Sequence, residues 1–451
     1  MNSLTNLLMG HDQITLSERQ RATHTYVVGQ SGTGKSRALE SWIMQDVLAG
    51  HGVGVIDPHG DLYDHLVARI AEHPALWEKV ILFNSLDPDW VVGFNPLEKI
   101  DKVSAERLAL HMTDISIKVW GLDTTQAPRM VWLLTNTFLA LVDLGLTLLD
   151  LPRFLMDGEY RENLLERVSL PAVRQYFRSE FPEAGRNSQH WVSPVLNKFG
   201  RLLFDPDIRL IFGRESTINF RRIMDEKMIL LVNLSKGILG EGMSALLAAF
   251  IVAHIQKTAL SRADRVNRPP FYFYLDEFQH YMTDTILDIL SESRKYALSL
   301  TLAHQFLDQL PRQLQQAVLN TAGTLVAFRV GYRDALVLAK EIFPAPDFIQ
   351  RPAFSSLFGR LRLEDAGWNG LALELSNLGT RQFWSRKRGS YEPVKQQTFW
   401  MPNPVYAPEK KEKINALRWR SGQIFARRKK ELHKKGTQQG TWEESIPLWV
   451  P

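Results

Sequence analysis

Short, continuously apolar runs recur along the chain and alternate with stretches in which apolar residues return every three or four positions. Runs that are apolar throughout are typical of strands buried on both faces of a sheet. They cover residues 25–28, 53–56, 80–83, 228–234, 271–275, 297–303 and 324–330. Helical spacing follows at 37–48, 243–261 and 334–342. This alternation predicts an α/β fold with a mostly parallel sheet.

One long stretch departs from the alternation. From 103 to 222 the apolar positions have only helical spacing, as at Leu108, Met112 and Ile115, and prolines punctuate the pattern. We therefore expect an all-α insertion within the α/β core. The expected parts are a first core portion at 1–100, the insertion at 101–222, a second core portion at 223–404 and a tail at 405–451.

Composition narrows the class of protein. The chain is 45% hydrophobic and 23% charged, as ordinary globular proteins are, and it contains no cysteine. A disulfide framework or a thiolate site is therefore excluded. The run at 245–255 is too short to cross a membrane, and the first residues lack a signal-peptide pattern. We expect a cytoplasmic protein without a membrane span.

The net charge of +5 is concentrated in the tail, where 405–451 holds 11 Lys or Arg and 5 Glu. Such a tail binds nucleic acid or an anionic surface, or is solvated. The tail also has a possible amphipathic helix, with Gly422 costing about 1 kcal/mol against Ala. Trp419 either stacks on bases or packs on the core or a neighbouring subunit. The residues that we expect to contact DNA are Arg427, Arg428, Lys429 and Lys430, together with Lys236 in a glycine-rich loop.

The strongest motif follows the first strand. Residues 29–36 match the phosphate-binding pattern G-x-x-x-x-G-K-[ST] at every fixed position, with a strand before and a helix after. Its backbone amides would surround phosphate oxygens, Lys35 would pair with the β- and γ-phosphates, and Ser36 would bind Mg²⁺. The expected nucleotide-binding residues are Gly29, Gln30, Ser31, Gly32, Thr33, Gly34, Lys35, Ser36 and Arg37.

Carboxylates close two other strands. Asp276 and Glu277 follow the run 271–275. Beside a phosphate loop, an acidic residue in this place holds Mg²⁺ and its neighbour accepts a proton from the attacking water. We assign the metal to Asp276 and the base to Glu277. Asp57 ends the run 53–56 and either orients water or Mg²⁺ from outside the first ligand sphere or caps the next helix.

A polar amide and several arginines complete the candidate set. Gln305 follows the run 297–303, where an uncharged amide suits sensing of the γ-phosphate. His304 is more typical of packing than of metal binding. Arg294, Arg329 and Arg381 are rival candidates for a cation supplied to a neighbouring subunit's γ-phosphate, and the residues alone do not choose among them.

The ordered set of motifs resembles the HerA/FtsK superfamily of ATPases, and within it the conjugative coupling-protein-like and type IV secretion-type ATPases. The segments that carry the resemblance are 29–36, 57–61, 233–237, 275–279, 293–296 and 303–305. The resemblance covers about residues 20–400 and implies a RecA-like core interrupted by an all-helical domain. Only 28 residues precede Gly29, so we expect neither the membrane helices nor the β-barrel that precede the core in relatives.

The resemblance implies a hexameric ring that hydrolyses ATP with Mg²⁺ at subunit interfaces and moves DNA through its centre. It assigns the γ-phosphate sensor to Gln305 and raises Arg294 above the other candidate fingers. A nuclease, a relaxase or a secretion-machine protein would be the partner. The alternatives are an ATPase acting on protein substrates and a nucleotide-gated scaffold for an effector, although a scaffold has no need of a base at Glu277.

Overall fold

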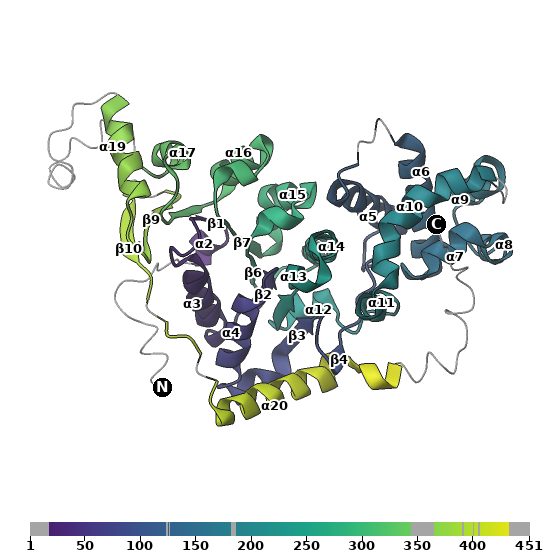
Figure 1. The fold of residues 1–451 in the computed structure, drawn as a ribbon, viewed down its shortest axis with the longest axis horizontal. Coiled ribbons are helices and arrows are strands. Elements are labelled where there is room, and N and C mark those ends of the chain that lie inside the picture. Colours follow the sequence, from purple (N-terminus) through teal and green to yellow (C-terminus); the bar gives the residue numbers. More distant parts are fainter. Residues whose placement is uncertain are drawn as a thin grey trace. The chain divides into compact units, whose positions relative to one another are not determined.

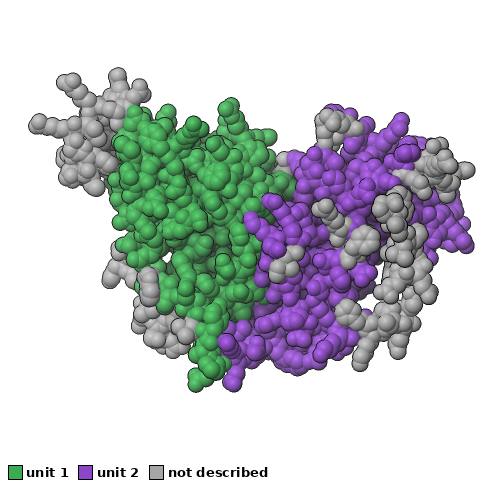
Figure 2. All heavy atoms as spheres, viewed as in Figure 1, with its two compact units in different colours: residues 1–72, 221–230, 262–410 green, residues 73–220, 231–261, 411–451 purple. Residues whose placement is uncertain are grey.

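A computed structural model describes residues 18–122, 125, 127–181, 186–343, 365–389, 392–399, 401–404 and 406–432. The chain folds into two compact units, coloured separately in Figure 2. Unit 1 comprises Met1–Glu72, Arg221–Leu230 and Arg262–Lys410, and unit 2 comprises His73–Phe220, Leu231–Ser261 and Lys411–Pro451. The expected division into four parts stays a prediction.

Unit 1 is built on most of a nine-stranded sheet. Its strands lie in the order β10 (Val394–Gln397), β9 (Gln382–Lys387), β8 (Thr324–Ala327), β1 (Thr25–Val28), β7 (Leu298–His304), β6 (Phe271–Leu275) and β2 (Gly52–Asp57). The sheet also contains β5 (Ile229–Asn233) and β3 (Val80–Asn84). The predicted α/β class with a mostly parallel sheet is confirmed.

The register of the parallel strands brings their carboxyl ends together. Val28 pairs with His304 and with Ala327, and Ile56 pairs with Leu275. The strands β1, β2 and β6 are buried along their whole length, as their continuous apolar runs predict. The residues that follow these strands therefore gather at one edge of the sheet, where α/β folds bind ligands.

Helices flank the strands of unit 1, with α3 and α4 on one side and α15 and α16 on the other (Figure 1). The helices are α2 (Glu18–Arg21), α3 (Lys35–Leu48), α4 (Asp61–Ile70), α12 (Phe220–Asp225), α15 (Asp284–Glu292), α16 (Arg312–Thr321), α17 (Tyr332–Ile342) and α19 (Asp365–Ser376), with short turns η3 (Arg262–Asp264), η4 (Phe278–Tyr281), η5 (Ser293–Tyr296) and η6 (Leu307–Gln309).

The sequence pattern did not predict the antiparallel hairpin of β9 and β10. Val326 of β8 pairs with Ser385 of β9, and Ser385 pairs in turn with Val394 of β10. The β10 strand is largely exposed and polar, so it lacks the continuous apolar run that marks a strand buried on both faces. The expected run 324–330 is also shorter than predicted, because β8 ends at Ala327.

Unit 2 is mainly helical, and every described element between β4 (Trp90–Val91) and β5 is a helix. They include α5 (Ala105–Val119), α6 (Pro128–Leu144), α7 (Asp150–Met156), α8 (Gly158–Leu165), α9 (Pro171–Gln175), α10 (Arg186–Phe204) and α11 (Pro206–Phe212). The unit also contains η1 (Pro74–Lys79), η2 (Tyr176–Glu180), α13 (Lys236–Leu239), α14 (Glu241–Ser261), β11 (Arg427–Arg428) and most of α20 (Pro408–Phe425).

Helix α14 confirms the helix expected at 243–261, beginning two residues earlier than predicted. The stretch Glu241–Asp264 is long and apolar enough to cross a membrane, and it alone meets this test among the described residues, but 83% of its most apolar window is buried in the structure. Both its sides are apolar because it is surrounded by protein. The stretch is therefore a core helix in this fold.

The expected helix in the tail is present as α20, and it packs on unit 2 through a glycine. Leu417 and Phe425 are buried. A Cβ on Gly422 would lie 2.3 Å from Cδ2 of Trp90, so only glycine permits this close approach. The hydroxyl of Ser421 accepts a hydrogen bond from the backbone N–H of Leu82 (3.0 Å).

Candidate active site

The phosphate-loop motif sits between the ends of two strands. The N–H of Gly29 donates to the carbonyl of His304 (3.3 Å), and the N–H of Gln30 donates to the carbonyl of Arg329 (2.9 Å). Gly34 has a φ of +105° and precedes α3 without offering a side-chain cap. The first amides of α3 have no partners within the helix, so they are available to an anion together with the positive end of the helix dipole.

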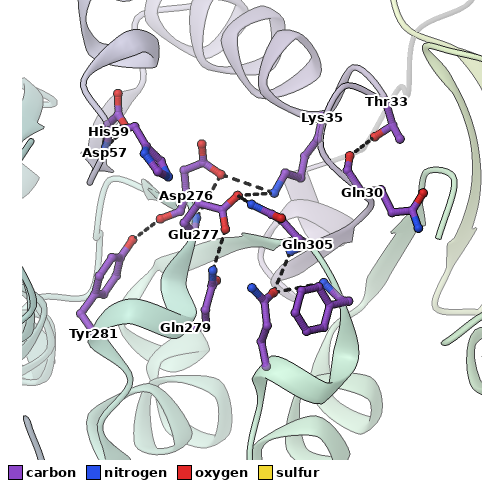
Figure 3. A network of polar contacts seen from close by, with 12 residues as sticks. Gln30, Thr33, Lys35, Asp57, His59, Asp276, Glu277, Gln279, Tyr281 and Gln305 are labelled. Carbon is purple, nitrogen blue, oxygen red and sulfur yellow. Dashed lines mark hydrogen bonds and ion pairs between the residues drawn. The ribbon is translucent and has the colours of Figure 1, made fainter. Parts of the chain in front are cut away.

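Lys35 points from the loop toward two carboxylates that follow β6 (Figure 3). Its Nζ lies 2.8 Å from Oε1 of Glu277 and 4.0 Å from Oδ1 of Asp276. All three side chains are buried. The register of β1, β7 and β6 produces this meeting of residues that are far apart in the sequence.

Glu277 is fixed from several directions. The amide of Gln305 donates to Oε1 (3.2 Å), and the amide of Gln279 donates to Oε2 (2.6 Å). Its own backbone N–H donates to Oδ1 of Asp276 (3.0 Å). Its φ is +46°, in the left-handed region that is uncommon for residues other than glycine. The surrounding contacts therefore hold its carboxylate in one position.

The two adjacent carboxyl groups have opposite pKa shifts. Burial raises the pKa of Asp276 to about 7, Lys35 opposes this, and the nearby charges of Asp57 and Glu277 add to it. Burial would also raise the pKa of Glu277, but Lys35 and the amides around it outweigh burial and lower it to about 2. Separated pKa values of this kind divide the roles of two carboxyl groups.

Asp57 caps the beginning of α4. Its two carboxylate oxygens accept hydrogen bonds from the backbone N–H groups of His59 and Tyr63, each 2.9 Å long. The structure thus shows the capping role, while a role toward water or Mg²⁺ stays a prediction. Asp57 also influences the site by its charge, which disfavours ionisation of Asp276.

The loop and Glu277 border a cleft of about 580 Å³, within the usual size range of small-molecule sites. The expected residues that line it are Gln30, Ser31, Gly32, Gly34, Lys35, Ser36, Arg37, Glu277 and Gln305. Gly29, Thr33, Asp57 and Asp276 were also expected at the site, but they do not line the cleft. The other lining residues are Thr380, Arg381, Phe399, Met401, Pro402 and Asn403, and sequence reasoning named only Arg381 among them.

The rival arginines occupy different places. Arg381 lines the cleft of its own chain, and its N–H donates to the carbonyl of Thr33 in the phosphate loop (2.7 Å). Arg329 is half-buried behind Gln30. Arg294 is exposed on η5 and does not line this cleft. Of the three, Arg294 is therefore the one presented outward from the site. His304 is fully buried against Tyr26 and Phe278, so it is a packing residue.

The expected DNA-contacting residues are not equally accessible. Lys429 is buried and forms an ion pair with Asp207 (2.5 Å). The guanidinium of Arg428 lies over the rings of Trp90 and Trp419, 5.3 and 4.5 Å from their centroids. The other residues expected to contact DNA are Lys236, which is half-buried at the start of α13, and Arg427 and Lys430, which are exposed. Lys429 is therefore a structural residue of unit 2, and its assignment to DNA contact is disfavoured.

No protein-family model matches this sequence, and no curated protein sequence matches it either. The fold is similar to that of the plasmid coupling protein TrwB, whose solved structures include complexes with nucleotides.

With the GTP analogue GDPNP, the TrwB structure has a TM-score of 0.61 at 16% identity, over 90% of this chain and 95% of that chain. For the TrwB complex with ADP and Mg²⁺, the TM-score is 0.60 at 15% identity, over 87% of this chain and 90% of that chain. For the TrwB complex with the ATP analogue ADPNP, the TM-score is 0.59 at 16% identity, over 90% of this chain and 95% of that chain. The resemblance to coupling-protein-like ATPases is confirmed at the level of the fold.

Proposed function

We propose that this chain hydrolyses ATP with Mg²⁺ at the cleft of unit 1. The observation that carries the proposal is the meeting of Lys35 with Glu277 and Asp276 at the mouth of a phosphate loop. A cation for the phosphates, a fixed carboxylate and a second carboxylate with a raised pKa are the parts that phosphoryl transfer to water requires.

The loop supplies most of the binding. The first amides of α3 suit the phosphate oxygens, and Lys35 adds a positive charge. Because Lys35 is paired with Glu277, a bound phosphate would compete for the same ammonium group. The pKa of Glu277 would then rise from about 2 toward the range of a general base, since it depends on that ammonium.

The residues present fit a magnesium ion held chiefly by nucleotide and water. No group of three His, Asp or Glu that could hold a metal occurs in the described part of the chain. The exposed hydroxyl of Ser36 and the carboxylate of Asp276 remain as the expected contributors. Burial raises the pKa of Asp276, and the charges of Asp57 and Glu277 add to this rise, so a nearby divalent cation would favour the ionised carboxylate. The ion would supply charge neutralisation of the phosphates.

Glu277 would accept a proton from the attacking water, and Gln305 would hold it in place while contacting the γ-phosphate. The amide of Gln305 already donates to Glu277, so one side chain would link the base to the phosphate. The exposed Arg294 would complete the site of a neighbouring subunit in a ring, which we expect to be hexameric.

We further propose DNA as the track of this motor, working in the cytoplasm in transfer or processing of DNA. The support is the TrwB-like fold, because TrwB is a plasmid coupling protein. A protein substrate is the competing candidate, because neither the fold nor the cleft distinguishes the two tracks. An effector scaffold is the weaker candidate, because it would have no need of a base such as the one we propose at Glu277, to which the amide of Gln305 donates.

The deciding experiment is steady-state ATP hydrolysis with and without single- or double-stranded DNA, with Glu277→Gln as the blank. We expect Mg²⁺-dependent hydrolysis that one form of DNA stimulates, with a steep salt dependence. Hydrolysis that neither form changes would contradict the DNA track and favour a protein substrate. No hydrolysis above the blank under any condition would contradict the enzyme assignment itself.

A further inference from the structure

The cleft extends past the hydrolytic groups to a wall made by the chain after β10. This wall consists of Phe399, Met401, Pro402 and Asn403. Lys35 and Arg37 lie two positions apart at the start of α3, so their side chains leave the helix about 200° apart. Lys35 points to Glu277, whereas Arg37 donates to Oδ1 of Asn403. The wall therefore lies on the side of α3 away from the hydrolytic groups.

The wall is joined to the phosphate loop at a defined point. The N–H of Arg381 donates to the carbonyl of Thr33 (2.7 Å), and its own carbonyl accepts from the N–H of Thr398 (2.8 Å), the residue before Phe399. Arg381 has a φ of +69°, and its Cα would lie 3.1 Å from a Cβ placed on Gly34. The wall thus begins within two residues of a backbone bridge to the loop.

A buried carboxylate fixes the far end of the wall. Glu40 is 1% exposed and forms ion pairs with both Arg37 (2.6 Å) and Arg69. Arg69 donates to the carbonyl of Pro402 (2.9 Å), and Arg37 donates to Asn403. Two arginines held by one carboxylate therefore position Pro402 and Asn403 against α3 and α4, which is the rigidity that a binding surface needs.

The chemistry of the wall is apolar. Phe399 is half-buried, Met401 is 6% exposed, and Pro402 is exposed. Aromatic and thioether groups of this kind pack well on the face of an aromatic ring. The charge of Arg37 is taken up by Glu40, so this side of the cleft does not suit a further phosphate.

From these contacts we propose that Phe399, Met401 and Pro402 form the subsite for the nucleoside part of the bound nucleotide, with the base lying against their apolar surface. The inference rests on the proposed ATP site, since the phosphate loop and Lys35 fix where the phosphates lie. With the γ-phosphate at Glu277 and Gln305, the ribose and base extend to the opposite side, where this wall stands.

Apolar contact with a base does not read its hydrogen-bonding edge. Because the side-chain oxygen of Asn403 is already engaged by Arg37, the wall offers little that separates adenine from guanine. ATP and GTP are therefore expected to bind with affinities within about fivefold of each other, since apolar pockets discriminate weakly between ligands of similar shape.

The test compares ADP with inorganic tripolyphosphate, which has phosphates but no nucleoside, by isothermal titration calorimetry in the presence of Mg²⁺. Phe399→Ala and Met401→Ala should each weaken ADP binding by about 5- to 100-fold, the usual loss for removing a side chain that stacks on a base. Tripolyphosphate binding should stay within about twofold of the unsubstituted protein. Lys35→Ala should weaken the binding of both ADP and tripolyphosphate.

Controls separate the subsite from folding. Val394→Ala removes an exposed apolar side chain from the same hairpin outside the cleft, and ADP binding should not change. If Phe399→Ala lowers the melting temperature, Phe399→Leu serves instead, because leucine keeps an apolar side chain in the same place. It should give an intermediate loss of ADP affinity.

Three results would overturn the proposal. ADP binding unaffected by both wall substitutions would show that the base lies elsewhere. Equal loss of ADP and tripolyphosphate would make the wall a support of the phosphate loop. Absence of binding of either ligand to the unsubstituted chain would refute the proposed ATP site, and the subsite with it.

Discussion

Glu277 combines a low pKa, a left-handed backbone and contacts to Lys35, Gln305 and Gln279. Each feature alone has a structural explanation, but together they hold one carboxylate at the edge of a phosphate-binding cleft. Strained and buried charged residues occur where function keeps them, because packing alone gains nothing from them. The residue-scale prediction therefore concerns this side chain.

Glu277→Gln should retain ATP binding and lose hydrolysis by about 100-fold or more, because an amide cannot accept the proton from water. Binding is measured by calorimetry and turnover by phosphate release. Gln279→Ala is the matched control, since it removes a neighbour of Glu277 but not the base, and it should keep more activity. Turnover of Glu277→Gln equal to the unsubstituted protein would refute the base assignment.

A second residue-scale prediction concerns His254, which is buried in α14 against Phe94 and Phe220. Burial lowers its pKa to about 4, and its hydrogen bond with the carbonyl of Pro96 only partly opposes this. In the unfolded chain the pKa of a histidine is near 6.5. Between that pH and about pH 4, His254 therefore binds a proton in the unfolded chain but not in the folded chain. His254 alone should therefore lower the stability by about 1.4 kcal/mol per pH unit of acidification between about pH 6.5 and 4.

His254→Gln keeps an N–H donor but does not titrate. Its loss of stability between pH 7.5 and 5.0, followed by chemical denaturation, should be smaller than that of the unsubstituted protein by about 2 kcal/mol. His59→Gln, at an exposed position, is the matched substitution with which the His254→Gln profile is compared. An unchanged pH dependence in His254→Gln would show that His254 is accessible to protons in the folded chain.

At the scale of elements, the phosphate loop and the strands could be predicted because each is encoded locally. The glycines of 29–34 specify a turn, and the buried strands β1, β2 and β6 are apolar throughout. The carboxyl ends of parallel strands necessarily meet, so the approach of Lys35 to Glu277 followed from the fold class.

The wall of the cleft could not be predicted in the same way. Phe399 and Met401 reach it because β9 pairs with β8 and because Arg69 and Arg37 hold residues 402–403. The contacts of Arg69 and Arg37 join positions more than 300 residues apart in sequence. An exposed polar strand such as β10 has no periodic hydrophobic pattern of its own. Likewise, nothing in the neighbouring sequence indicates that Glu40 is buried and forms ion pairs with two arginines.

The tail shows the same limit. Helical propensity counts Gly422 as a defect of about 1 kcal/mol, but the structure makes it a contact position. Likewise, the basic composition suggested DNA contact for Lys429, whereas the fold pairs it with Asp207. Composition reports charge, but only tertiary contacts report whether a charge is already paired.

Gly422→Ala should consequently destabilise the protein, although alanine is the better helix former. The new Cβ would lie 2.3 Å from Trp90 and would displace α20 from β4. We expect a cost of about 1–3 kcal/mol, as for overpacked cores, measured by chemical denaturation. In the control, the exposed Ala416→Gly should cost only about 1 kcal/mol through propensity. A stabilised Gly422→Ala protein would contradict the close packing of α20.

At the scale of the whole molecule, one chain's cleft contains Arg37 and Arg381 but not Arg294. Arg294 lies on a turn whose neighbours are held, since Arg268 donates to the carbonyl of Lys295 (3.1 Å) and Arg262 donates to that of Tyr296 (3.3 Å). An exposed cation on a fixed turn is the arrangement expected of a residue supplied to a neighbouring subunit.

Arg294→Ala should abolish hydrolysis in uniform rings and regain activity when mixed with Glu277→Gln. At equal amounts, about a quarter of the interfaces would join an intact base to an intact arginine, because each interface takes one from each neighbour. Phosphate release is followed across mixing ratios. Lys295→Ala, on the same exposed turn, serves as the control and should stay active. No recovery at any ratio would exclude Arg294 as a residue acting in trans.

The pairing of β1 has a consequence for how the protein is made. Both neighbours of β1 in the sheet, β7 and β8, belong to the last third of the chain, and the contact of Tyr26 with His304 spans 278 residues. At about 5–20 residues per second, a ribosome needs tens of seconds to deliver these partners. Meanwhile the helices α5 to α11 can form, because their contacts join residues that are close in sequence and already synthesised. The loop at 29–36 is translated well before β7 and β8, and it would thus be among the last parts to reach a conformation that binds a nucleotide.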